Sequence, residues 1–169
     1  MDAEITNEFI HELITCQKVI KRAERKNMIE ANRSLRNNIV LTSHDGKYEY
    51  VLFLRQSCEF LEDFSVGLKW TNPSKYFNIN KSIILFRCQG PHDSKKPEGI
   101  DCHHDYHVHE ITVNDIKERR YEKPQNKEVC KEFSSFESAI YYFCKKCGIS
   151  NLNEYINIDF SEGEQMSII

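Results

Sequence analysis

The sequence contains no long apolar run, and this absence excludes a large class of proteins. No hydrophobic stretch within its 169 residues approaches the roughly 20 residues that a membrane-spanning helix needs. The first residues, MDAEITNEF, are acidic and polar, whereas a secretory signal would be basic and then apolar. These absences predict a cytoplasmic protein that has no contact with a membrane.

The chain also lacks an excess of positive charge and an even set of cysteines. Its formal net charge is −3, so overall electrostatics does not indicate a nucleic-acid-binding protein, and an anionic ligand would need a local basic patch. The seven cysteines are odd in number and irregularly spaced, which indicates reduced thiols and not a disulfide framework.

What is present indicates a folded α+β protein. A hydrophobic fraction of 40% and an aromatic fraction of 11% are enough for a core, and the length suits a single domain spanning 1–169. We expect a single antiparallel sheet of about five strands with an N-terminal and a C-terminal helix packed on it. The predicted parts are a helix in 1–32, the sheet in 38–112, a closing helix in 134–148 and an acidic tail in 151–169.

The N-terminal helix is predicted from a helical period between residues 5 and 31. Apolar residues at steps of three and four form one stripe: Ile5, Phe9, Leu13, Cys16 and Ile20. The same segment carries a basic cluster of Lys18, Arg22, Arg25 and Lys26. Such cations either oppose the negative end of the helix dipole or contact phosphates.

Five segments have the alternation or apolar content of strands: 38–43, 48–56, 65–70, 81–89 and 105–112. A turn containing Gly46 joins the first two, and short polar loops between the others favour antiparallel pairing. The charged stretch from Asn114 to Glu132, broken by Pro124, is predicted to be a loop.

The closing helix has the clearest signals in the chain. Ser134 and Glu137 match a capping box, Phe133 stands outside it as a possible hydrophobic staple, and Gly148 is placed where a helix end favours glycine. The pair Cys144 and Cys147 matches the CxxC spacing of zinc or redox sites. Because Cys147 lies on the apolar stripe and no second CxxC exists, packing is the better interpretation.

The chemistry is concentrated between Arg87 and His109. Five of the seven histidines fall within these residues: His92, His103, His104, His107 and His109. If 105–112 is a strand, His107 and His109 point to the same face about 7 Å apart. With Arg87 on the neighbouring strand, several imidazoles would meet one guanidinium, which are the parts needed for proton transfer beside a bound phosphate.

Two other interpretations of this cluster remain open. His92, His107, His109 and Asp105 could bind zinc, iron or manganese, although no intact metal motif such as HExxH is present. Alternatively, the histidines are ordinary surface or capping residues of a polar loop, the interpretation that we favour for His11 and His44.

The segments ILFRCQGPH (84–92) and HHDYHVHE (103–110) resemble the TumE-type toxins of bacterial toxin–antitoxin modules and related small bacterial proteins. In that family a strand with an arginine runs to a Pro-His turn, a His-x-His strand follows, and a helix closes the chain, here FSSFESAIYYFCKKCGI. The resemblance covers about residues 81–150. It implies an RNA-directed activity in which Arg87, His92, His107 and His109 take the catalytic places.

The predicted function is therefore metal-independent cleavage of RNA, with no cofactor. One histidine would deprotonate the 2′-hydroxyl, Arg87 would offset the charge on the phosphate, and a second histidine would protonate the leaving 5′-oxygen. We expect substrate contacts from Lys18, Arg22, Arg25, Lys26 and His104, and an antitoxin or another protein as a possible partner. The alternatives are a non-enzymatic protein-binding inhibitor or accessory factor from a mobile element, and a His-ligated metalloprotein.

Overall fold

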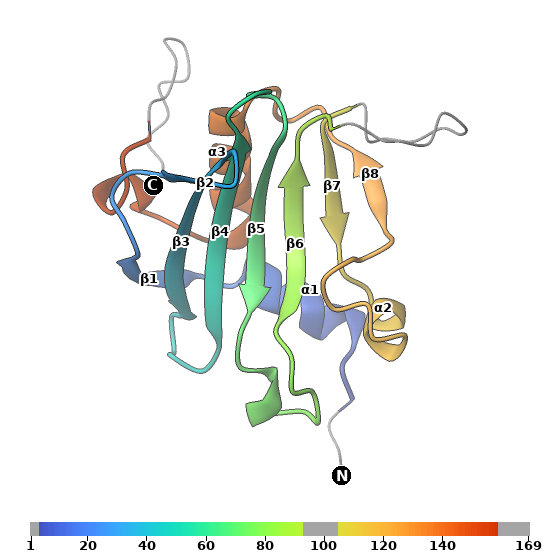
Figure 1. The fold of residues 1–169 in the computed structure, drawn as a ribbon. Helices are drawn as coiled ribbons and strands as arrows, with labels where there is room; N and C mark the ends of the chain where they lie inside the picture. The colour runs from blue at the N-terminus through green and yellow to red at the C-terminus, as the bar shows by residue number, and fades with distance from the viewer. Residues whose placement is uncertain (1–3, 93–104, 159–169) are drawn as a thin grey trace, which may run out of the picture.

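The computed structural model describes residues 4–92 and 105–158 and has an α+β fold, as predicted. Its mostly antiparallel sheet has eight strands in the described part of the chain, more than the five expected. The strand order is β1-β3-β4-β5-β6-β7-β8, and β2 also pairs with β3 (Figure 1). The strands are β1 Lys18–Ala23, β2 Ile29–Ala31, β3 Ser34–Ser43, β4 Glu49–Ser57, β5 Phe64–Trp70, β6 Ile83–Gln89, β7 His107–Glu110 and β8 Lys127–Val129.

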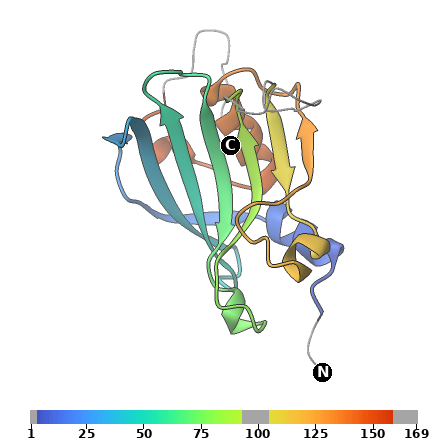
Figure 2. The same ribbon diagram turned by 45° about the vertical axis from the view of Figure 1, so that its right-hand side comes forward.

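The helices cover one face of this sheet and leave the other face open. Figures 1 and 2 show α1 and α3 behind the strands, with α2 beside one end of β7. The helices are α1 Asn7–Thr15, α2 Val113–Lys117 and α3 Phe136–Cys147, with short 3-10 turns η1 Pro73–Lys75 and η3 Leu152–Glu154. No helix in the described ranges is both long enough and apolar enough to cross a bilayer.

The hydrophobic core lies between the sheet and the two larger helices. Along β4, Tyr50, Leu52 and Leu54 are buried and point toward the helices, whereas the residues between them are only partly buried. The same alternation in β3 buries Ile39 and Leu41. Because successive side chains of a strand point to opposite faces, the residues between these core positions lie on the open face.

The predicted N-terminal helix is wrong beyond its first turns. Helix α1 ends at Thr15, and the chain then forms β1 and β2 along the edge of β3. Ile20 fits both a helical step of four and the alternation of β1, where it is buried between exposed Val19 and Lys21. The periodicity alone could not distinguish the two, and pairing with β3 determines the outcome.

Two other segments differ from the prediction. The stretch 114–132, predicted to be a loop, contains most of α2 and all of β8. The segment 151–158, assigned to an acidic tail, packs on the core through Leu152 and Ile156, which are both buried. The rest of that tail lies outside the described residues.

The closing helix agrees closely with its signals. Gly148 ends α3 in the left-handed conformation with φ of 66°, as predicted. The capping box is shifted by one residue, from the predicted Ser134 and Glu137 to Ser135 and Ser138. Cys144 and Cys147 are both buried in the core, which confirms the packing interpretation, and burial raises the pKa of the Cys147 thiol to about 12.

Candidate functional site

A single row of residues crosses the open face of the sheet from β3 to β8. The strand registers place six residues side by side, one from each strand: Asn38, Phe53, Gly67, Arg87, His109 and Lys127. Adjacent strands are about 4.8 Å apart, so Arg87 and His109 are immediate neighbours. A second row, two residues along each strand, contains Arg36, Arg55, Ser65, Gln89 and His107.

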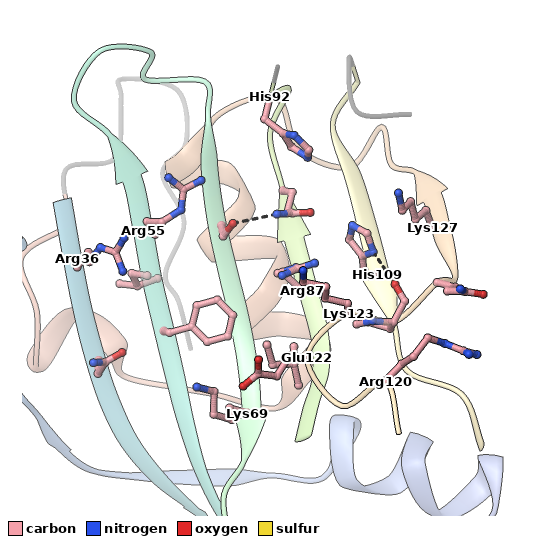
Figure 3. A pocket seen from close by; sticks show the side chains of 18 residues that line it. Arg36, Arg55, Lys69, Arg87, His92, His109, Arg120, Glu122, Lys123 and Lys127 are labelled. Atoms are coloured by element: carbon pink, nitrogen blue, oxygen red, sulfur yellow. Dashed lines mark hydrogen bonds between the residues drawn. The ribbon is translucent and has the colours of Figure 1, made fainter. Parts of the chain in front are cut away.

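Most residues of these rows lie on the floor of a broad groove of about 1130 Å³, shown from close by in Figure 3. Loop residues 120–125 form the wall beside β7 and β8. Among the described residues that line it, Glu122 supplies the one carboxylate, against seven basic side chains: Arg36, Arg55, Lys69, Arg87, Arg120, Lys123 and Lys127. The chain as a whole is acidic, so this face concentrates positive charge locally and is suited to a polyanion.

Most of these cations are not neutralised by neighbouring carboxylates. Arg55 pairs with Asp63 at 2.7 Å, and Arg120 pairs with buried Asp115 at 3.0 Å. Four others form no ion pair within residues 4–92 and 105–158: Arg36, Lys69, Arg87 and Lys123. Such cations gain more from a bound anion than cations already held in ion pairs.

Arg87 lies at the centre of the groove on β6. Its Nε is buried and has no hydrogen-bond partner in the described part of the chain. Burial, together with the positive charge of Arg55, lowers the pKa of the Arg87 guanidinium. A guanidinium held without a partner offers its fork of donors to an incoming phosphate.

His109 lies beside Arg87 on β7 and is 97% buried, with 3% of its surface exposed. Its Nδ1 donates a hydrogen bond to the backbone carbonyl of Pro124 at 3.3 Å, which leaves Nε2 as the basic nitrogen (Figure 3). No described residue donates a hydrogen bond to this Nε2. Burial, with smaller contributions from the charges of Arg87 and His107, lowers the pKa of His109 to about 3. The imidazole is therefore neutral at pH 7.

His107 lies in the second row, but it is fully buried and does not line the groove. Both ring nitrogens face an acceptor oxygen: Nδ1 lies 2.8 Å from the carbonyl of Asp105, and Nε2 lies 3.1 Å from the side-chain oxygen of Gln89, so a neutral ring donates to one of the two. The Gln89 amide nitrogen donates in turn to the hydroxyl of Ser65 at 3.1 Å. Polar contacts of His107 therefore reach β6 and, through Gln89, the hydroxyl on β5, and its ring centroid lies 5.0 Å from that of His109.

His92 occupies the other side of this group. It follows the end of β6 and lines the groove (Figure 3). Its ring centroid lies 5.5 Å from that of His107. The three imidazoles and Arg87 are therefore brought together as the sequence predicted. His103, His104 and Cys102 lie outside the described residues.

The loop that presents Pro124 is anchored by Asp115, at the start of α2. The Asp115 carboxylate accepts hydrogen bonds from Thr112, from Arg120 at 3.0 Å and from the backbone of Gln125 at 3.2 Å. Burial acts to raise the pKa of Asp115, but these hydrogen bonds outweigh it and hold the pKa below its ordinary value. Asp115 thereby positions the Pro124 carbonyl, which fixes the orientation of His109.

The predicted substrate contacts from the N-terminal segment do not reach this groove. Lys18 is buried, and its Nζ donates to the carbonyls of Ile14, Cys16 and Cys147, so it cannot contact RNA. The other three predicted residues are exposed but do not line the groove: Arg22, Arg25 and Lys26. Arg22 lies on the edge strand β1 and the other two follow it, because the long helix that grouped them does not form.

Sequence reasoning missed the basic residues on the far side of the groove, Arg36, Arg55 and Lys69. Lys69 stands on β5 between core residues Leu68 and Trp70, and in β4 the alternation that buries Leu52 and Leu54 already assigns Arg55 to the opposite face. The sequence of a single strand therefore already indicated which of its basic residues faces away from the core. The register that brings Arg36 opposite Arg55 was not readable from the sequence.

A search of residues 4–92 and 105–158 finds no group of three or more His, Cys, Asp or Glu side chains arranged to hold a metal ion. Comparisons with protein-family models, with curated proteins and with solved structures gave no match to this chain.

Proposed function

We propose that the protein is a ribonuclease of the toxin type that cleaves RNA in this groove without a metal ion. The observation that supports it most strongly is the pair formed by His109 and Arg87. A neutral imidazole with an unused basic nitrogen stands next to a guanidinium with an unused donor, both at the floor of a basic groove. A base beside a phosphate-binding cation is what the attack of a 2′-hydroxyl on its own phosphodiester needs.

In the proposed reaction, Nε2 of His109 accepts the proton of the 2′-hydroxyl, and the 2′-oxygen forms a bond to the adjacent phosphorus. The bond from phosphorus to the 5′-oxygen breaks, and His92 donates a proton to that leaving oxygen. Arg87 offsets the negative charge that develops on the phosphate oxygens. The products are a 2′,3′-cyclic phosphate and a 5′-hydroxyl, and no other reactant is consumed.

The low pKa of His109 is compatible with a role as general base, because this pKa is that of the groove before substrate binds. The charge of Arg87 contributes to lowering it, and a bound phosphodiester would counteract that charge. Substrate binding would thus raise the basicity of Nε2 when the base is needed. His107, held by Asp105 and Gln89, keeps the neighbouring imidazoles apart and in place.

The test is the cleavage of a labelled RNA oligomer by purified protein in the presence of excess chelator. We expect cleavage by the wild type and a rate at least about 100-fold lower for His109→Ala, because general-base catalysis contributes a factor of this order. The matched control is His44→Ala, since His44 is exposed in the turn between β3 and β4 and should have no effect. Equal rates for wild type and His109→Ala would refute the proposal.

A further inference from the structure

Phe53 is an aromatic residue on the wrong face of the sheet for a core role. It lies on β4 between buried Leu52 and Leu54, so its side chain points away from the helices and into the groove. It is partly buried, yet it belongs neither to the core cluster nor to the residues packed against that cluster. No other Phe, Tyr or Trp lies among the described residues that line the groove.

Gly67 explains how the ring is held. Gly67 pairs with Phe53 on the neighbouring strand, and a Cβ at position 67 would overlap the outer atoms of the Phe53 ring. The ring therefore rests on bare backbone, which supports one of its faces and leaves the other toward the groove. An aromatic ring supported in this way forms a flat platform.

Cations surround this platform. Nζ of Lys69 lies 5.8 Å from the ring centroid, and Arg55 stands on the same strand two residues away. Arg87 follows Gly67 in the row across the sheet, two strand spacings or about 10 Å from Phe53. A flat apolar surface among phosphate-binding cations is the combination that binds single-stranded nucleic acid, because bases stack on the ring while the backbone follows the charges.

We propose that Phe53 is the platform on which a base of single-stranded RNA stacks, with a neighbouring phosphate on Arg87. This deepens the proposed function, because it assigns the strand a path from β4 toward the His109 side of the groove. It also makes the substrate single-stranded, since the bases of a duplex stack on one another and are not available to Phe53.

The test measures binding alone, so it does not depend on cleavage. The probe is a fluorescent 2′-O-methyl RNA oligomer, in which the nucleophile is blocked, and its comparator is an abasic oligomer with the same number of phosphates. We expect the wild type to bind the base-containing oligomer at least 10-fold more tightly, because stacking on an aromatic ring contributes about this much per base. In Phe53→Leu this preference should disappear, with affinity for the abasic oligomer unchanged.

Phe53→Trp supplies a direct readout. The single tryptophan of the chain, Trp70, is 1% exposed in the core, so a new tryptophan at position 53 reports on the groove. The base-containing oligomer should quench this added fluorescence and the abasic oligomer should not. Matching thermal unfolding curves for wild type, Phe53→Leu and Phe53→Trp would show that each variant is folded.

The outcomes separate the two proposals. Binding that depends on Phe53, in a protein that does not cleave RNA, would support the platform and remove the ribonuclease. If the protein cleaves RNA but its Phe53→Leu variant keeps the full preference for the base-containing oligomer, the ribonuclease is supported and the platform is removed. The platform proposal is also overturned if no oligomer binds at low salt, or if a mononucleotide competes as well as the oligomer.

Discussion

At the scale of single residues, His109 links the site to the stability of the fold. Its pKa is about 3 in the folded protein and near 6.5 when unfolded, because burial and the charge of Arg87 disfavour the imidazolium. Above pH 6.5 the ring is neutral in both states and contributes nothing to pH dependence. Between pH 6.5 and 3 the unfolded chain binds one more proton, so the free energy of unfolding falls as the pH falls.

We therefore expect wild type to lose up to about 2 kcal/mol more than His109→Asn when the pH is lowered from 7 to 5, at about 1.4 kcal/mol per pH unit below 6.5. Asparagine offers an amide donor for the Pro124 carbonyl but does not titrate. Urea unfolding of both proteins at pH 7, 6 and 5 measures the difference. The same loss of stability in both proteins would mean that folding does not lower the pKa of His109, which would contradict its burial beside Arg87.

Arg87 acts on the same residue through its charge. Replacing it in Arg87→Met removes one of the causes that lower the pKa of His109, so that pKa should rise toward its ordinary value. Arg36→Met is the control, because Arg36 lies on the opposite side of the groove and is not among those causes. NMR titration of the imidazole resonances measures the pKa of His109 in each protein. An unchanged pKa in Arg87→Met would contradict an effect of the Arg87 charge on the His109 ring.

At the scale of secondary structure elements, Lys18 joins the ends of two helices. Its Nζ donates to Ile14 and Cys16 at the end of α1, at 2.6 and 2.9 Å, and to Cys147 at the end of α3, at 2.7 Å. Carbonyl groups at helix ends have no partner within the helix, and a buried cation there satisfies three at once. The first residue of β1 thereby fixes both helices against the sheet.

Lys18→Met should cost about 3 kcal/mol of unfolding free energy, because it leaves buried carbonyls without donors. Lys21→Met, at an exposed position of the same strand, should change it by less than about 0.5 kcal/mol. Chemical denaturation of the two variants gives both values. A loss as small in Lys18→Met as in Lys21→Met would show that these hydrogen bonds contribute little.

The elements that the sequence predicted well are those with one clear period. Strands β3 to β7 alternate or are apolar, and α3 ends at a glycine that adopts the left-handed conformation. The failures have physical causes. Ile20 satisfies two periods at once, and β8 is exposed at every position, so burial leaves no pattern in it.

The His cluster and Arg87 were found from composition, but the row joining Phe53 to His109 depends on register across strands far apart in the chain.

At the scale of the whole molecule, the fold separates its functions by face. Helices α1 and α3 bury the core on one side of the sheet, which frees the other side to carry charge (Figure 2). The chain has a net charge of −3, yet the described residues that line the groove include seven basic side chains against Glu122. Such a local positive field attracts polyanions even to an acidic protein. The histidines lie at the end of this field nearest β7, where a strand crossing the sheet would meet them.

The chemical nature of the cleaved ends tests the central claim most directly. Mass spectrometry of the fragments from a defined RNA oligomer, cleaved in the presence of chelator, should find 2′,3′-cyclic phosphate and 5′-hydroxyl ends. An oligomer with a single 2′-deoxy nucleotide should resist cleavage at that position alone. Fragments with 3′-hydroxyl and 5′-phosphate ends, or cleavage after the deoxy nucleotide, would contradict an attack by the 2′-hydroxyl beside His109 and Arg87.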